Sequence, residues 1–135
     1  MAPYCQHCDR PLVPLDVPPP LREFAPGASA VVGSCPRCLR TSAVAAETAD
    51  AVESDDATLP EAVPDGDGRV AVALVLGHLD SLATNRAAIE AFVEHAERGG
   101  ADVFLTLDRL AADDAVDPHA ELARRRRQLE SLLDY

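Results

Sequence analysis

Cys5-Gln6-His7-Cys8 and Cys35-Pro36-Arg37-Cys38 are the two stretches of sequence that decide the fold of this chain. They contain all four cysteines of the 135 residues, and residues 9–34 lie between them. Two Cys-x-x-Cys pairs at such a separation are typical of a metal site. Each pair forms a tight turn whose two sulfurs point to one place, and two facing turns supply four tetrahedral donors. The sequence therefore predicts one metal ion bound by Cys5, Cys8, Cys35 and Cys38.

Zinc is the metal expected at this site, because four cysteines around one ion are typical of structural zinc. Such a site has no open coordination position, so we predict a structural role rather than a catalytic one. Iron is the closest alternative, since a tetrathiolate site also accepts it. Redox or disulfide chemistry is less favoured, because no strand has room before Cys5 and no secretory signal is present. His7 is expected to be an exposed residue of the first turn.

Short apolar segments surround the two cysteine pairs and predict strands. Residues 12–17 form the first of these, and Pro14 makes that strand either an edge strand or a broken one. Residues 30–34 lead into the second cysteine pair, and residues 39–44 lead out of it. A strand on each side of a cysteine turn is the layout of a zinc ribbon. We therefore predict that residues 1–45 are a small β zinc ribbon.

Residues 46–68 differ from the rest in composition. They contain no basic residue and eight acidic ones, namely Glu47, Asp50, Glu53, Asp55, Asp56, Glu61, Asp65 and Asp67. A run of uncompensated charge resists collapse and stays solvated. The segment is therefore predicted to be an acidic linker between two domains.

Residues 69–135 show helical periodicity throughout. The pattern predicts helices over residues 69–83, 86–98 and 102–112, the first of them apolar nearly all round and therefore buried. Asp117-Pro118 is typical of a helix start and predicts a fourth helix from residue 118. Short loops between four amphipathic helices indicate a small bundle or cluster. The expected fold is α+β: an N-terminal zinc ribbon, an acidic linker and a C-terminal four-helix bundle or cluster.

Charge and hydropathy restrict the location and the partners of the chain. Its formal net charge is −11, and all 12 of its basic residues are arginine. An acidic excess without lysine suggests adaptation to high salt, where surface carboxylates keep a protein hydrated. Acidity alone argues against nucleic-acid binding, but less strongly in a salt-adapted protein. No apolar run approaches the ~20 residues of a membrane span, and no signal peptide is visible, so we expect a cytoplasmic protein.

No pattern for catalysis accompanies the cysteines. His78, His95 and His119 are widely spaced, and neither a phosphate loop nor a nucleophile with its base is present. The run of arginines from Arg124 to Arg127 could bind phosphates. We favour a solvated helix face instead, because Arg125 and Arg126 have acidic neighbours one turn away. We therefore expect no enzyme activity and infer no small-molecule substrate.

The chain as a whole resembles an uncharacterised family of small haloarchaeal zinc-ribbon proteins. The similar stretches are residues 5–8, 35–41, 79–86 and 107–111. The resemblance implies a metal site and a cytoplasmic location, and it implies no assigned activity. Within residues 79–86, we expect Asp80, Asn85 and Arg86 to form a polar network at a helix corner.

Three functions are consistent with these patterns. The first is a non-enzymatic zinc-binding protein that acts through a protein partner, as the closed metal site and the absence of catalytic groups indicate. The second is a nucleic-acid-associated zinc ribbon, which Arg10, Arg37, Arg40 and the run of arginines at 124–127 would support. The third is a rubredoxin-like electron carrier with iron in the four-cysteine site.

Overall fold

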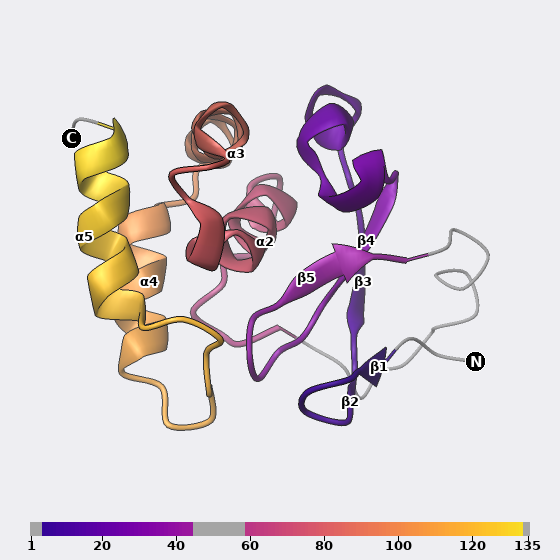
Figure 1. Ribbon diagram of the computed structural model, residues 1–135, viewed down its shortest axis with the longest axis vertical. Coiled ribbons are helices and arrows are strands. Elements are labelled where there is room, and N and C mark those ends of the chain that lie inside the picture. The colour runs from indigo at the N-terminus through magenta and orange to yellow at the C-terminus, as the bar shows by residue number, and fades with distance from the viewer. Residues whose placement is uncertain (1–3, 45–58, 134–135) are drawn as a thin grey trace.

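A computed structural model describes residues 4–44 and 59–133 of the chain. The fold is α+β, with strands and the cysteine cluster in the N-terminal part and helices in the C-terminal part (Figure 1). This confirms the predicted class but not a four-helix bundle. Helix α2 (Arg69–Gly77) lies between the strands and the remaining helices (Figure 1). None of the helices in these two ranges is both long and apolar enough to cross a membrane.

The described strands form two small antiparallel sheets. Strands β1 (Tyr4–Cys5) and β2 (Arg10–Pro11) pair with each other. Strands β3 (Val13–Asp16), β4 (Val31–Ser34) and β5 (Thr41–Ala43) form the second sheet, with β4 in the middle. Pro14 therefore lies in an edge strand, as predicted. Two 3₁₀ helices, η1 (Pro19–Phe24) and η2 (Pro26–Ala28), connect β3 to β4.

Helix α2 is as buried as its sequence predicts, but it ends six residues before the expected residue 83. Every residue from Ala71 to Leu76 is buried. Nδ1 of His78 lies 2.7 Å from the Leu74 carbonyl oxygen, and the His78 backbone N–H donates to Val75 instead. The His78 side chain thus occupies the acceptor that a further helical residue would use. A 3₁₀ turn, η3 (Leu79–Ser81), follows.

Helices α3 (Arg86–Arg98) and α4 (Val103–Ala111) match their predicted ranges closely. Helix α5 (Leu122–Leu133) does not, because it begins four residues after the expected residue 118. The backbone amides of Asp117 and His119 donate to the carbonyls of Arg37 and Cys38, at 2.7 and 2.9 Å. These long-range hydrogen bonds hold the segment against the second cysteine turn, and the helix starts only beyond it.

One hydrophobic core joins the sheet to the helices. It includes Leu15 and Val32 from the strands, Leu74 and Leu76 from α2, and Phe92 from α3. Contact between the sheet and α2 is close at Gly77, where an added Cβ would lie 2.6 Å from Thr41 Cβ. The N-terminal strands and the C-terminal helices are therefore packed together. Whether they also fold as separate domains, divided at residues 45 and 68, stays a prediction.

The predicted linker is only partly described, and its described part is packed against the core at its apolar residues and exposed at its acidic ones. Val63 is 6% exposed and belongs to the same core, and Leu59 and Ala62 pack against that core. These apolar residues are therefore packed against the core, whereas the acidic Glu61, Asp65 and Asp67 are exposed, as predicted. Whether the segment acts as a linker between two domains stays a prediction. Residues 46–58 of the linker lie outside the described residues.

Candidate metal centre

The structure brings the four predicted ligands together. The Sγ atoms of Cys5, Cys8, Cys35 and Cys38 all lie within 4.8 Å of one another. The sulfurs of Cys5 and Cys38 are 3.6 Å apart. A tetrahedral zinc site with Zn–S bonds of about 2.3 Å has sulfurs about 3.8 Å apart. The cluster therefore fits one metal ion bound by four sulfurs.

Both cysteine turns have the same backbone geometry. The amide of Asp9 donates to the Cys5 carbonyl at 2.9 Å, and the amide of Leu39 donates to the Cys35 carbonyl at 3.0 Å. Asp9 and Leu39 follow the second cysteine of their pairs and have left-handed φ angles of 53° and 67°. A left-handed φ is unusual for a leucine and costs roughly 1–2 kcal/mol. Leu39 must therefore be held in place by its surroundings.

Burial closes the site to solvent and affects its thiols. Cys5, Cys35 and Cys38 are buried, and Cys8 is half-buried. Burial, together with the neighbouring Cys38 and Cys35, raises the pKa of the Cys8 thiol to about 12. Burial also raises the pKa of Cys35. Without a metal these two thiols hold their protons near neutral pH, and a metal ion must displace them.

At Cys5 and Arg40, hydrogen bonds rather than burial decide the direction of the pKa shift, and both shifts favour the charged form. Burial raises the pKa of Cys5, but hydrogen bonds from the backbone of His7 and Cys8 outweigh it and lower the pKa overall. A hydrogen bond to Cys38 raises the pKa of Arg40, which therefore stays cationic. Zinc with four thiolates carries two negative charges, so the Arg40 guanidinium offsets part of them. From the sequence, Arg40 was predicted only as a possible nucleic-acid contact, although its place two residues after Cys38 was a signal for a role at the cluster.

His119 has a structural position that the sequence did not indicate. Its side chain is only 3% exposed. Nε2 lies 2.8 Å from the Leu76 carbonyl and must donate to it, and Nδ1 lies 3.9 Å from a carboxylate oxygen of Asp80. The backbone amide of the same residue contacts Cys38. His119 therefore ties the second cysteine turn to the end of α2.

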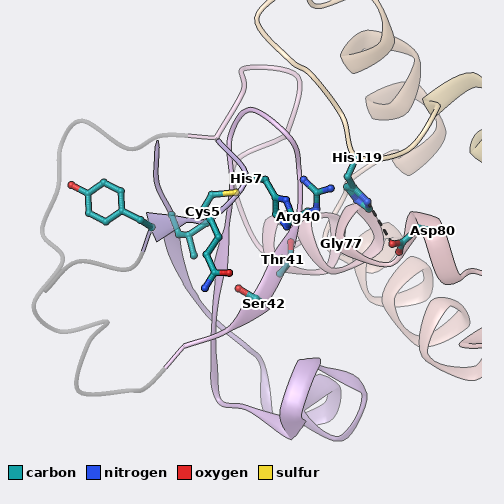
Figure 2. A pocket seen from close by; sticks show the side chains of 11 residues that line it. Cys5, His7, Arg40, Thr41, Ser42, Gly77, Asp80 and His119 are labelled. Atoms are coloured by element: carbon teal, nitrogen blue, oxygen red, sulfur yellow. Dashed lines mark ion pairs between the residues drawn. The ribbon is translucent and has the colours of Figure 1, made fainter. Parts of the chain in front are cut away.

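A cavity of about 390 Å³ lies beside the cluster (Figure 2). Cys5, Gln6 and His7 of the first turn form one part of its lining, while His119 and residues 40–42 contribute to the rest. His7 is exposed, as predicted. In Figure 2 the side chains of His7, Arg40 and His119 follow one another from the first turn towards Asp80.

The run of arginines at 124–127 divides into residues with structural partners and residues exposed to solvent. Arg126 pairs with Asp108 at 2.7 Å and with Glu130, and its guanidinium lies 5.2 Å from the centre of the Phe104 ring. Arg124 and Arg127 are exposed, as a solvated helix face requires.

The predicted corner network exists in a different form. Asn85 does not cap α3, because its side-chain amide donates to the carbonyl and the hydroxyl of Ser81 at 3.0 Å. Arg86 pairs with Glu90 one turn further along α3. Asp80 contacts His119 instead.

A model of a protein family of unknown function, DUF6276, matches residues 4–133. The chain belongs to this family. The matched range includes the four cysteines and every element from β1 to α5. No curated protein and no solved structure matches the chain. The function of this DUF6276 member must therefore be inferred from its own site.

Proposed function

We propose that this protein binds one structural zinc ion through its four cysteines and acts, without catalysis, by binding a protein partner. The closed sulfur cluster carries this proposal. Four protein sulfurs fill a tetrahedral coordination shell, so no position is left for a substrate or an activated water. Burial of three of the cysteines further limits access to the ion.

The polar groups near the cluster support a non-catalytic role. His119 and Asp80 lie 3.9 Å apart in the lining of the adjacent cavity, which His7 also lines. The His119 ring is almost fully buried, and its Nε2 is committed to the Leu76 carbonyl. A general base must reach a substrate proton, and the other ring nitrogen, Nδ1, faces Asp80 in a side chain that is only 3% exposed. This histidine serves as a packing and hydrogen-bonding residue instead.

An exposed aromatic residue beside the cluster supports a protein partner. Tyr4 is 55% exposed and directly precedes the first metal ligand. Tyrosine is enriched at protein interfaces and is often among the residues that dominate their binding energy. Leu105 on α4 is the other large hydrophobic residue that is exposed among the described residues. It provides a matched control for Tyr4.

Nucleic acid is the less favoured partner. Arg10 and Arg37 line the same hollow beside the cluster, but Glu61 and Asp113 line it as well. Arg126 is occupied by acidic neighbours. A nucleic-acid site needs basic groups gathered without acidic ones between them. The surface around the cluster is thus better suited to a protein.

Two measurements test the proposal. Protein purified without added metal should contain one zinc ion per chain by mass spectrometry. Iron in its place would support the electron carrier.

The second measurement is co-purification. Tagged wild-type protein, isolated in high salt after nuclease treatment, should retain a stoichiometric protein partner. The Tyr4→Ser variant should lose this partner, and the Leu105→Ser variant should keep it. Release of the bound material by nuclease would overturn the protein-partner proposal in favour of nucleic acid.

A further inference from the structure

The second cysteine turn is built into the body of the protein. The carbonyls of Arg37 and Cys38 accept hydrogen bonds from Asp117 and His119. Leu39, the next residue, is fully buried in the core that contains the helices. The Thr41 hydroxyl donates to the Ala73 carbonyl of α2 at 2.9 Å. Packing and hydrogen bonds that do not involve a metal therefore fix this half of the site.

The first cysteine turn is attached in a different way. Within residues 4–44 and 59–133, its strands β1 and β2 pair only with each other, and the Asp9 amide donates within the turn. Between residues 4–11 and the other described residues, the polar contacts all involve cysteine sulfurs. Most of the turn is exposed, and Cys5 belongs to a small apolar cluster separate from the main core.

We propose that residues 4–11 form a metal-held flap, while the second turn is a preformed half-site. This inference rests on the metal-binding part of the proposed function. An isolated two-stranded hairpin is marginal in water, and ordering it costs backbone entropy. Without the sulfur–metal bonds, little in the structure opposes that cost. Loss of the ion therefore releases the flap and leaves the sheet and helices folded.

Release of the flap has two consequences for the surface. Cys5, Gln6 and His7 belong to the flap and form part of the lining of the cavity beside the cluster (Figure 2). The cavity thus becomes open on that side when the flap leaves. Tyr4 also loses its fixed position. The metal ion in this way controls both the cavity and the exposed aromatic residue next to it.

Hydrogen exchange of the full-length protein tests the flap. Zinc-loaded protein is compared with protein stripped by a chelator under reducing conditions. We expect amide exchange in residues 5–10 to accelerate on the order of 100-fold or more on stripping, while β4, β5 and α2 change only a few-fold. Equal loss of protection in β4 and β5 would overturn the inference, and so would a flap that stays protected.

Thiol labelling gives a second readout on the same samples. In stripped protein, Cys5 and Cys8 should react with an alkylating agent at least about ten-fold faster than the buried Cys35 and Cys38. Similar rates for all four thiols would contradict a preformed half-site.

The double variant Cys5→Ser/Cys8→Ser removes the flap's sulfurs without altering the main hydrophobic core. Its flap should exchange rapidly with or without zinc, and its helical signal should match that of the stripped wild type. A protected flap in this variant would show that other contacts hold it. Wild-type protein that takes up no zinc overturns both the metal role and the flap. Wild-type protein that binds zinc but keeps its flap protected after stripping overturns the flap alone.

Discussion

Leu39 shows how a single residue connects the metal site to the fold. Its left-handed φ of 67° is required by the turn that presents Cys35 and Cys38. Glycine would adopt this conformation without strain, but it would leave a void, because the Leu39 side chain is 0% exposed in the main core. Burial of a leucine contributes about 1.5–3 kcal/mol, which exceeds the backbone strain.

Leu39→Ala should therefore destabilise the zinc-loaded protein by about 2–5 kcal/mol, since it keeps the backbone strain and removes the buried side chain. Urea unfolding in high salt measures this change. Leu105→Ala, at a position 43% exposed on α4, is the control and should lie within about 0.5 kcal/mol of wild type. Equal effects of the two substitutions would show that Leu39 does not anchor the second turn.

The thiols make zinc affinity depend on pH. The pKa of Cys8 is raised to about 12, and that of Cys35 is also raised, so both thiols are protonated in the metal-free protein at neutral pH. Zinc must displace these protons, and its affinity therefore rises as pH rises. Displacement of at least two protons corresponds to binding that tightens at least about 100-fold per pH unit. Competition with a chromophoric chelator between pH 6 and 8, corrected for the chelator's own protonation, measures the slope. A flat profile would mean that the thiols are already ionised.

At this scale the sequence predicted the four cysteines that cluster but not the residues that support them. The spacing of the cysteines was sufficient because a tetrahedral site constrains it locally. His119 could not be found in this way, since its contacts are with Leu76 and Cys38, which are distant in sequence. Leu39 could be read only as the start of a strand.

Among the elements, α5 packs against α4 through contacts of Arg126 that the sequence of α5 shows only in part. The predicted one-turn pair between Arg126 and Glu130 is present. The contacts of Arg126 with Asp108 and with the Phe104 ring come from α4 and could not be read from α5 alone. The exposed Arg127 lies next to it in the chain.

Arg126→Ala should therefore lower the free energy of unfolding by about 1 kcal/mol, because it removes a pair with Asp108 and a cation–π contact that are both partly exposed. Arg127→Ala should have almost no effect. Thermal unfolding of the two variants in the same salt compares them directly. If Arg127→Ala costs as much as Arg126→Ala, the effect comes from helix propensity or net charge instead.

Local signals explain which element ends were predicted correctly. Helix α3 has a one-sided apolar stripe and ends before Gly99 and Gly100, and both signals lie within the segment itself. The end of α2 depends on the His78 side chain, and the start of α5 depends on carbonyls of the second cysteine turn. Periodicity contains no information about such distant or side-chain hydrogen bonds.

At the scale of the whole molecule, the shared core argues against independent unfolding of its two parts. Val32 and Leu39 from the N-terminal part pack in the same cluster as Leu74 and Phe92. We expect zinc-loaded protein in high salt to lose the helical signal and the protection of β4 and β5 in one transition. Urea unfolding followed by circular dichroism and by pulsed hydrogen exchange makes the comparison. Two separate midpoints would instead support the domains predicted from the sequence.

Charge acts on the molecule as a whole and should make its stability depend on salt. The net charge is −11, and residues 46–68 contain eight acidic residues without a basic one. Several arginines of the helical part are already paired, including Arg69, Arg86 and Arg98. Much of the acidic excess therefore lacks a basic partner. The Debye length grows from about 3 Å at 1 M salt to about 30 Å at 0.01 M, so repulsion among these carboxylates grows on dilution.

The helical signal should therefore fall as potassium chloride is reduced from molar to millimolar concentration. Zinc should stay bound longest, since thiolate–metal bonds depend little on screening. Circular dichroism and zinc content measured on the same samples test both statements. A variant with Glu47, Asp50, Glu53, Asp55 and Asp56 replaced by their amides should need less salt, because it removes charge without altering any described residue. If wild type keeps its full helical signal in dilute buffer, the composition does not reflect adaptation to salt. The acidity would then count fully against nucleic-acid binding.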